Sequence, residues 1–218
     1  MTWPAIEKIS AMHRLPDGYR YEQLARSEIP ELVRAIETWH PDIAVGIGSC
    51  YVRESFYRDK VFLQGEEERD FFVVLIKYGD ELAGMGSWEW EADALTLYTR
   101  LGIVSPAHRG TGVAGRAVEF TTNLARAMGA GFVYGLATLK MPQAQLALAR
   151  AGYQLLGFVP GYDRELVAPG VVKRVYEAVY AKVLVPDEQL LRPDPKNMSP
   201  KAKALWELLF PSPPTINR

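Results

Sequence analysis

The sequence predicts a mixed α/β fold, of the α+β kind with a mixed sheet. Three observations support this prediction. Strand-like segments form an early block, the long stretches of helical periodicity follow it, and an uninterrupted apolar run separates two of those helical stretches. An antiparallel meander placed first is not typical of a doubly wound parallel sheet, in which strands and helices alternate from the start.

Each element follows from a local pattern. Alternating or continuous apolar runs with turn residues at their ends predict strands, which cover residues 18–25, 71–78, 81–90, 94–104, 132–139, 153–159 and 172–184. The turn at Gly79 and Asp80 joins two of these strands as a hairpin. Helical spacing and end signals predict helices that begin at Ser27, after Ser49, at Val113 and at Pro142.

The tail differs from the rest of the chain. Residues 185–218 contain seven of the fifteen prolines, and Ser199 followed by Pro200 can begin a short helix. We therefore expect one domain over residues 1–184 and a Pro-rich C-terminal tail with a short helix over 185–218. This tail either packs on the domain as a strap or supplies a homodimer contact.

Composition excludes several classes of protein. The 25 basic and 26 acidic residues give a net charge of -1 without a basic cluster, which argues against a nucleic-acid partner. Cys50 is the single cysteine, so neither an internal disulfide nor a cysteine metal site is expected. The first residues lack a signal-peptide pattern, and no apolar run reaches the roughly 18 residues of a membrane span. We expect a cytoplasmic protein with no metal and no membrane partner.

The stretch HRGTGVAG, residues 108–115, allows two interpretations. Its three glycines fit the dinucleotide pattern G-x-G-x-x-G, but that pattern requires an acidic residue about 20 positions on. No Asp or Glu lies between Glu119 and Asp163, so a nicotinamide-dependent oxidoreductase is disfavoured. The alternative, R-x-x-G-x-A, uses small residues and the amides of a helix N-terminus to hold a pyrophosphate, with Arg109 as a nearby cation.

Two segments carry a family resemblance. LGIVSPAHRGTGVAGRAVE, residues 101–119, resembles the acetyl-CoA signature of the GNAT superfamily of N-acetyltransferases. AQLALARAGYQLLGFVPGY, residues 144–162, resembles the fourth helix of that family with the turn and strand that follow. The resemblance spans roughly residues 20–184. It implies the GNAT acyl-CoA N-acyltransferase fold, with a central, largely antiparallel sheet whose fourth and fifth strands splay and which helices flank.

The resemblance also implies a site. Acetyl-CoA would be the acyl donor, and a primary amine of a small molecule or peptide would be the acceptor. The pantetheine arm would pair with main-chain groups of Leu101, Ile103 and Val104. The pyrophosphate would lie against the loop formed by Arg109, Gly110, Thr111, Gly112, Val113, Ala114 and Gly115.

The catalytic residues depart from the family pattern. Leu148 occupies the position where the fourth helix commonly carries a tyrosine acid, so Tyr162 is the candidate acid, with a surface turn as its alternative role. Glu89 is the candidate base; with Glu91 it shares one strand face, which could equally be a solvated face. Because the usual acid is missing, a non-catalytic acyl-CoA-binding module of the same fold stays open as an alternative.

Overall fold

The computed structural model describes residues 2–12 and 14–211. The chain divides into two compact units, Met1–Leu184 and Val185–Arg218. The second unit contains helix α6, Pro200–Leu209, which begins where the sequence predicts. The Ser199 hydroxyl accepts the Ala202 N–H at 3.3 Å, and Pro200 is the first helical residue, where its missing N–H leaves no bond unmade.

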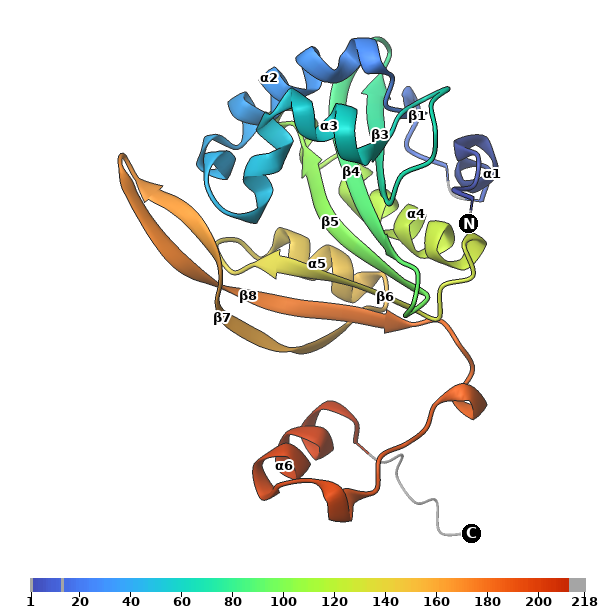
Figure 1. The fold of residues 1–218 in the computed structure, drawn as a ribbon, viewed down its shortest axis with the longest axis vertical. Coiled ribbons are helices and arrows are strands. Elements are labelled where there is room, and N and C mark those ends of the chain that lie inside the picture. Colours follow the sequence, from blue (N-terminus) through green and yellow to red (C-terminus); the bar gives the residue numbers. More distant parts are fainter. Residues whose placement is uncertain (1, 13, 212–218) are drawn as a thin grey trace. The chain divides into compact units, whose positions relative to one another are not determined.

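Within the described residues, eight strands form one mixed sheet (Figure 1). They are β1 (Tyr19–Gln23), β2 (Val61–Phe62), β3 (Phe71–Tyr78), β4 (Glu81–Glu91), β5 (Thr96–Val104), β6 (Phe132–Thr138), β7 (Gln154–Ala168) and β8 (Val171–Val183). Their order is β1-β3-β4-β5-β6-β8-β7, and the short β2 pairs with β3. The β5–β6 and β2–β3 pairs are parallel and all the others are antiparallel.

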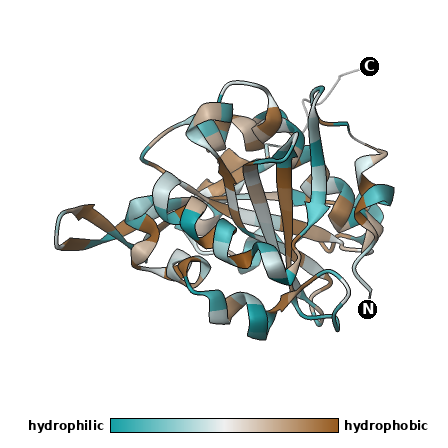
Figure 2. Ribbon diagram, turned by 90° about the horizontal axis from the view of Figure 1, so that it is seen from above, coloured by the Kyte–Doolittle hydropathy of each residue, from teal (hydrophilic) through white to brown (hydrophobic). Residues whose placement is uncertain are grey.

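Helices cover both faces of the sheet. In the first unit they are α1 (Ile6–Ser10), α2 (Ile29–Trp39), α3 (Glu54–Lys60), α4 (Val113–Ala127) and α5 (Gln143–Arg150). Phe120 and Leu124 of α4 belong to one buried cluster with Trp88 and Leu97, on one face. Helices α2 and α3 supply a second cluster on the opposite face. Figure 2 shows the apolar residues gathered in the strands and the hydrophilic ones along the outer sides of the helices.

The predicted mixed fold with splayed strands is confirmed. The predicted fourth and fifth strands are β5 and β6, because the two-residue β2 carries no local strand signal and is not predicted. The β3–β4 hairpin turns at Gly79 and Asp80 as expected, because Gly79 adopts a φ of 55° that few other residues tolerate.

Two predictions about element boundaries are wrong. Ser27 does not cap α2; it lies in a 3-10 turn, Arg26–Glu28, and the Glu28 side chain instead accepts the Ala25 N–H at 2.9 Å. The strand predicted to end at Val159 continues to Ala168 and forms a long hairpin with β8.

Candidate functional site

Strands β5 and β6 pair over only part of their length. Their parallel ladder joins Thr96–Thr99 to Phe132–Gly135, after which β5 continues along β4 while β6 continues along β8 (Figure 1). Among the described residues, positions 100–104 therefore have no strand partner on the β6 side. Gly102 is exposed there, and a Cβ at this position would meet no atom within 4 Å. The sheet thus has an open edge near its middle.

The main-chain groups that face this gap follow from the ladder. In an antiparallel pair, alternate residues direct their N–H and C=O groups at the partner strand. The Ser105 N–H donates to a β4 carbonyl at 2.8 Å, so Leu101 and Ile103 also face β4. Gly102 and Val104 then direct their main-chain groups into the gap. Of the three residues predicted to pair with the pantetheine arm, only Val104 faces the gap, because β4 already pairs with the main-chain groups of Leu101 and Ile103. Sequence reasoning missed Gly102, although counting back by two from Val104 would have found it.

A glycine-rich loop connects the open edge to α4. After the 3-10 turn Pro106–His108, Gly110 and Gly112 adopt left-handed φ angles of 80° and 89°. No side chain caps the N-terminus of α4, and a Cβ at Gly110, Gly112 or Gly115 would meet nothing within 4 Å. The first amides of α4 therefore face open space at the positive end of the helix dipole, which is an arrangement suited to an anion.

The other loop residues predicted to bind the pyrophosphate differ in how far their side chains are buried. The Arg109 side chain is exposed and its Nε lies 3.4 Å from the Val104 carbonyl oxygen. The Thr111 hydroxyl donates to the His108 carbonyl at 2.8 Å. Ala114 is exposed in the first turn of α4, whereas the Val113 side chain is buried. Val113 can therefore offer an incoming ligand only its main chain.

Polar side chains lie on the α2–α3 face of the sheet, next to the point where β5 and β6 part. Glu89 stands opposite Tyr98 in the β4–β5 ladder, and its Oε2 is 3.1 Å from Arg100 Nη1. Arg100 lies over the Tyr98 ring, 5.1 Å from its centroid. The Tyr134 hydroxyl donates to Glu91 at 2.7 Å, and its ring stacks on Tyr98 at 4.6 Å.

Tyr162 reaches the same cluster from β7. It follows Pro160 and Gly161 in an irregular stretch of the β7–β8 ladder, between the pairs Val159–Glu177 and Asp163–Val175. Its side chain is 41% exposed and hydrogen-bonds Tyr98; burial and this bond together raise the pKa of Tyr98. The sequence placed Tyr162 just past a strand, but it lies within β7. The two predicted catalytic residues, Glu89 and Tyr162, are thus brought to one cluster.

Comparison with known proteins agrees with this geometry. The profile of the Acetyltransferase (GNAT) family matches residues 31–158, which is more than half of the chain. The chain belongs to the GNAT acetyltransferase family. The matched region contains the open edge of β5 and the glycine-rich loop. A search of curated proteins gives no match for the sequence.

Solved GNAT structures share the fold at low sequence identity. The spermidine/spermine N-acetyltransferase SpeG from Vibrio cholerae aligns with a TM-score of 0.60 and 11% identity, covering 77% of this chain and 95% of its own. RimL, a ribosomal alpha-N-protein acetyltransferase in complex with coenzyme A, aligns with a TM-score of 0.59 and 14% identity, covering 78% of this chain and 96% of its own. The microcin self-immunity acetyltransferase MccE, in complex with acetyl-CoA and AMP, aligns with a TM-score of 0.59 and 16% identity, covering 78% of this chain and 94% of its own.

The position where this GNAT chain departs from the family pattern lies away from Tyr98. Leu148 is on α5 and packs against the core on the α4 side of the sheet. Tyr153 is 4% exposed, with its hydroxyl 3.3 Å from that of Thr122, and burial raises its pKa to about 12. Tyr153 is therefore a core residue, whereas Tyr162 contacts Tyr98, beside the point where β5 and β6 part.

The segment before and through α3, residues 42–60, contacts β7 and the residues next to it. The Ile47 N–H donates to Asp163 Oδ1 at 2.7 Å, and Lys140 Nζ lies 2.7 Å from Asp42 Oδ2 and 2.6 Å from Glu165 Oε2. Nearby on β8, burial and the charges of Asp163 and Glu165 raise the pKa of Glu177 to about 7. These contacts fix the position of the part of the β7–β8 hairpin that carries Tyr162.

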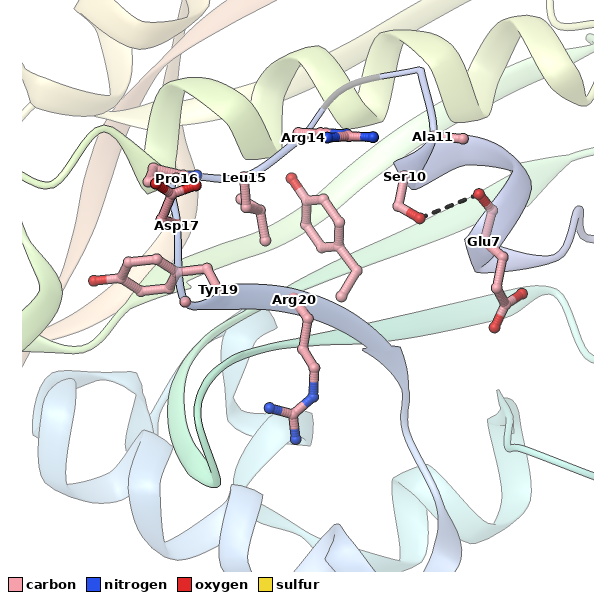
Figure 3. Close-up of a pocket in the computed structure, with 11 residues that line it drawn as sticks. Glu7, Ser10, Ala11, Arg14, Leu15, Pro16, Asp17, Tyr19 and Arg20 are labelled. Carbon is pink, nitrogen blue, oxygen red and sulfur yellow. Dashed lines mark hydrogen bonds between the residues drawn. The ribbon is translucent and has the colours of Figure 1, made fainter.

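A separate cavity of about 430 Å³ lies between α1 and β1 (Figure 3). Glu7, Ser10 and Arg14 line it from α1 and the segment after it, and Tyr19 and Arg20 line it from β1. Strand β1 is at the edge of the sheet, so this cavity is distinct from the gap between β5 and β6. It holds none of the predicted site residues.

No group of three His, Cys, Asp or Glu side chains is arranged to bind a metal ion in residues 2–12 and 14–211. In the same part of the chain, no helix combines the length and the apolar character that a bilayer crossing requires.

Proposed function

We propose that this GNAT chain transfers the acetyl group of acetyl-CoA to a primary amine of a small molecule or peptide. The observation that supports this most strongly is the continuity of the open β5 edge with the uncapped N-terminus of α4. A long ligand with a pyrophosphate at one point and amide groups further along would suit both features.

Different residues of the loop and of β5 would bind different parts of acetyl-CoA. The pyrophosphate would accept hydrogen bonds from amides of residues 110–115, with Arg109 adding a positive charge. The pantetheine amides would pair with the Gly102 carbonyl and the main-chain groups of Val104, in the manner of an added strand. The thioester would then lie where the β5–β6 ladder ends, beside Tyr98 and Tyr162.

The protein must take a proton from the amine, stabilise the oxyanion and protonate the leaving thiolate. The amine must be neutral to attack the thioester carbon, so a base must take its proton; the Glu89 carboxylate, held in place by Arg100, would do so directly or through water. The Gly102 N–H faces the gap and can donate to the oxyanion that forms. When the C–S bond breaks, the thiolate takes the Tyr162 hydroxyl proton and leaves as coenzyme A thiol. The nitrogen, positively charged after the attack, loses its extra proton as the amide forms, and this proton would return to the Tyr162 phenolate, which keeps its hydrogen bond with Tyr98.

One experiment tests donor binding. Thermal unfolding would be followed with acetyl-CoA, coenzyme A, NAD or NADP added separately. A ligand present at 100 times its Kd stabilises the fold by about 2.7 kcal/mol, which raises the unfolding temperature by several degrees. We expect this rise with the two coenzyme A compounds and none with the nucleotides. A rise with NAD or NADP alone would contradict the proposal.

A second candidate is a module that binds acyl-CoA without turnover. The leucine at position 148 favours it, because no tyrosine acid stands on α5. Release of free thiol from acetyl-CoA with a panel of polyamines, amino acids and N-terminal peptides would decide between the two. Binding without amine-dependent thiol release would support the module and contradict the enzyme.

A further inference from the structure

His108 is a buried polar residue that the proposed mechanism does not use. It directly precedes Arg109, and only 8% of its surface is exposed. It ends the 3-10 turn that leads from β5 into the glycine-rich loop. Burying an imidazole is unfavourable unless its nitrogens find partners, so its contacts indicate what it does.

These contacts reach across the sheet to its far edge. His108 Nδ1 shares a hydrogen bond of 2.8 Å with the hydroxyl of Tyr19 on β1, and the two rings meet edge to face at 5.5 Å. The Tyr78 ring, which packs on Tyr19 at 4.8 Å, lies on the same side of the imidazole at 5.6 Å. Nε2 lies 3.3 Å from Glu81 Oε1 but makes no hydrogen bond within the described residues. A proton on Nε2 leaves Nδ1 to accept the Tyr19 O–H. The side chain thus joins the loop after β5 to β1, the outermost strand on that side.

The main chain of His108 holds the start of the loop. Its N–H donates to the Ser105 carbonyl at 3.0 Å, and its carbonyl accepts the Thr111 hydroxyl at 2.8 Å. The next buried residue is Val113, 1% exposed, at the start of α4. Residues 109–112 are exposed and include two left-handed glycines. The exposed part of the loop therefore lies between two buried residues, the polar His108 and the apolar Val113.

We propose that His108, through its hydrogen bond to Tyr19, is a positioning residue for the phosphate-binding loop and sets the affinity for coenzyme A without contacting it. The inference rests on the proposed function, since it takes the loop to bind the pyrophosphate. The bond fixes where the His108 carbonyl lies, and this carbonyl orients Thr111 within the loop. Loss of the bond would let the loop amides diverge before the ligand binds, so binding would have to order them again.

The test compares four single variants and one double variant of the full chain by calorimetric titration with coenzyme A. His108→Leu removes the bond and keeps much of the volume, while Tyr19→Phe removes it from the opposite strand and keeps the ring. We expect each to weaken coenzyme A binding by about tenfold, the equivalent of one hydrogen bond. His108→Asn, whose amide can still meet the Tyr19 hydroxyl, should recover most of the affinity.

Tyr78→Phe is the matched control, because Tyr78 packs in the same ring cluster but makes no hydrogen bond to His108. It should bind coenzyme A as the unchanged protein does. In turnover, Tyr19→Phe should raise KM for acetyl-CoA and leave KM for the amine unchanged. The double variant of Tyr19→Phe and His108→Leu should be no weaker than either single variant, because both remove the same bond.

The outcomes separate this inference from the proposed function. Failure of the unchanged protein to bind coenzyme A would overturn the proposed function itself. Normal binding by a folded Tyr19→Phe variant would overturn only the role of His108, even if His108→Leu does not fold. The role of His108 would also be overturned if Tyr78→Phe lowered the affinity for coenzyme A equally, or if His108→Asn bound coenzyme A as poorly as His108→Leu. In either case the loss of affinity would come from the packing and not from the hydrogen bond.

Discussion

At the scale of single residues, the loop depends on glycine for both its shape and its open space. Gly112 has a φ of 89°, in the left-handed region that other residues adopt at a cost of about 1–2 kcal/mol. A Cβ there would meet no protein atom, so a side chain would project into the space assigned to the pyrophosphate. Substitution therefore tests the ligand site more than the packing.

We predict that Gly112→Glu weakens coenzyme A binding by more than about tenfold, because its carboxylate would repel the pyrophosphate at short range. Gly112→Asn is the control, since asparagine tolerates the left-handed region and is uncharged. Titration calorimetry with coenzyme A measures the difference. Equal affinities in the two folded variants and the unchanged protein would remove the site assignment.

Tyr162 gives the second prediction at this scale. Tyr162→Phe keeps the ring and removes the proton that the thiolate would take, so we expect kcat to fall by about 10²-fold while the affinity for acetyl-CoA stays the same. Tyr176→Phe, at an exposed tyrosine of the same hairpin, should be neutral. Steady-state turnover and acetyl-CoA titration check the two effects. An unchanged kcat in Tyr162→Phe would return this side chain to a surface role.

At the scale of elements, the β7–β8 hairpin is held beside the site by one close approach of main chain. A Cβ at Gly46, which has a φ of 83°, would lie 2.1 Å from the Arg164 carbonyl oxygen and 2.3 Å from Asp163 Oδ1. Any side chain at position 46 would therefore separate β7 from the segment before α3. The glycine allows the Ile47 N–H to reach Asp163.

We predict that Gly46→Ala lowers the free energy of unfolding by about 3 kcal/mol, through backbone strain and this overlap. Gly65→Ala is the matched control, because Gly65 has a similar φ of 76° but nothing within 4 Å of its Cβ position. The control should lose only about 1 kcal/mol. Urea unfolding measures both; losses of equal size would mean that the contact with β7 contributes nothing.

Glu177 makes the stability of the hairpin depend on pH. Its pKa is raised to about 7 by burial and by Asp163 and Glu165, so between about pH 4.5 and 7 the folded chain binds more protons than the unfolded chain. Stability contributed by this group is therefore present at low pH and is lost as the pH rises through 7. We predict that Glu177→Gln is more stable than the unchanged chain at pH 8, by about 1 kcal/mol after allowance for solvent screening, and no more stable at pH 4.5. Urea unfolding at both values checks the sign.

Sequence reasoning succeeded where one local signal decides an element. The turn at Gly79 and Asp80 and the start of α6 at Ser199 each follow from the chemistry of one or two residues. It failed along β7, because Pro160 and Gly161 imitate the end of a strand although pairing with β8 resumes beyond them. The contact between Tyr162 and Tyr98 depends on that long hairpin, so no local pattern could have predicted it.

At the scale of the whole molecule, the first unit contains the sheet and both buried clusters. The sequence predicted a boundary after residue 184, from the change in composition alone. We predict that a chain ending at Pro186 unfolds within about 2 °C of the full chain and binds coenzyme A with the same affinity. Thermal unfolding and titration measure these quantities. A large fall in the unfolding temperature would mean that residues 187–218 belong to the same cooperative unit.

The partial pairing of β5 and β6 also makes the sheet mechanically uneven. Four residue pairs, Thr96–Phe132 to Thr99–Gly135, form the one ladder between the half-sheet β1-β3-β4-β5 and the half-sheet β6-β8-β7 within the described residues. Such a short seam can act as a hinge, and a ligand that hydrogen-bonds along the unpaired part of β5 would stiffen it. Donor binding would then restrict the relative motion of the half that carries Glu89 and the half that carries Tyr162, and so hold the two proposed catalytic residues in one cluster during the reaction.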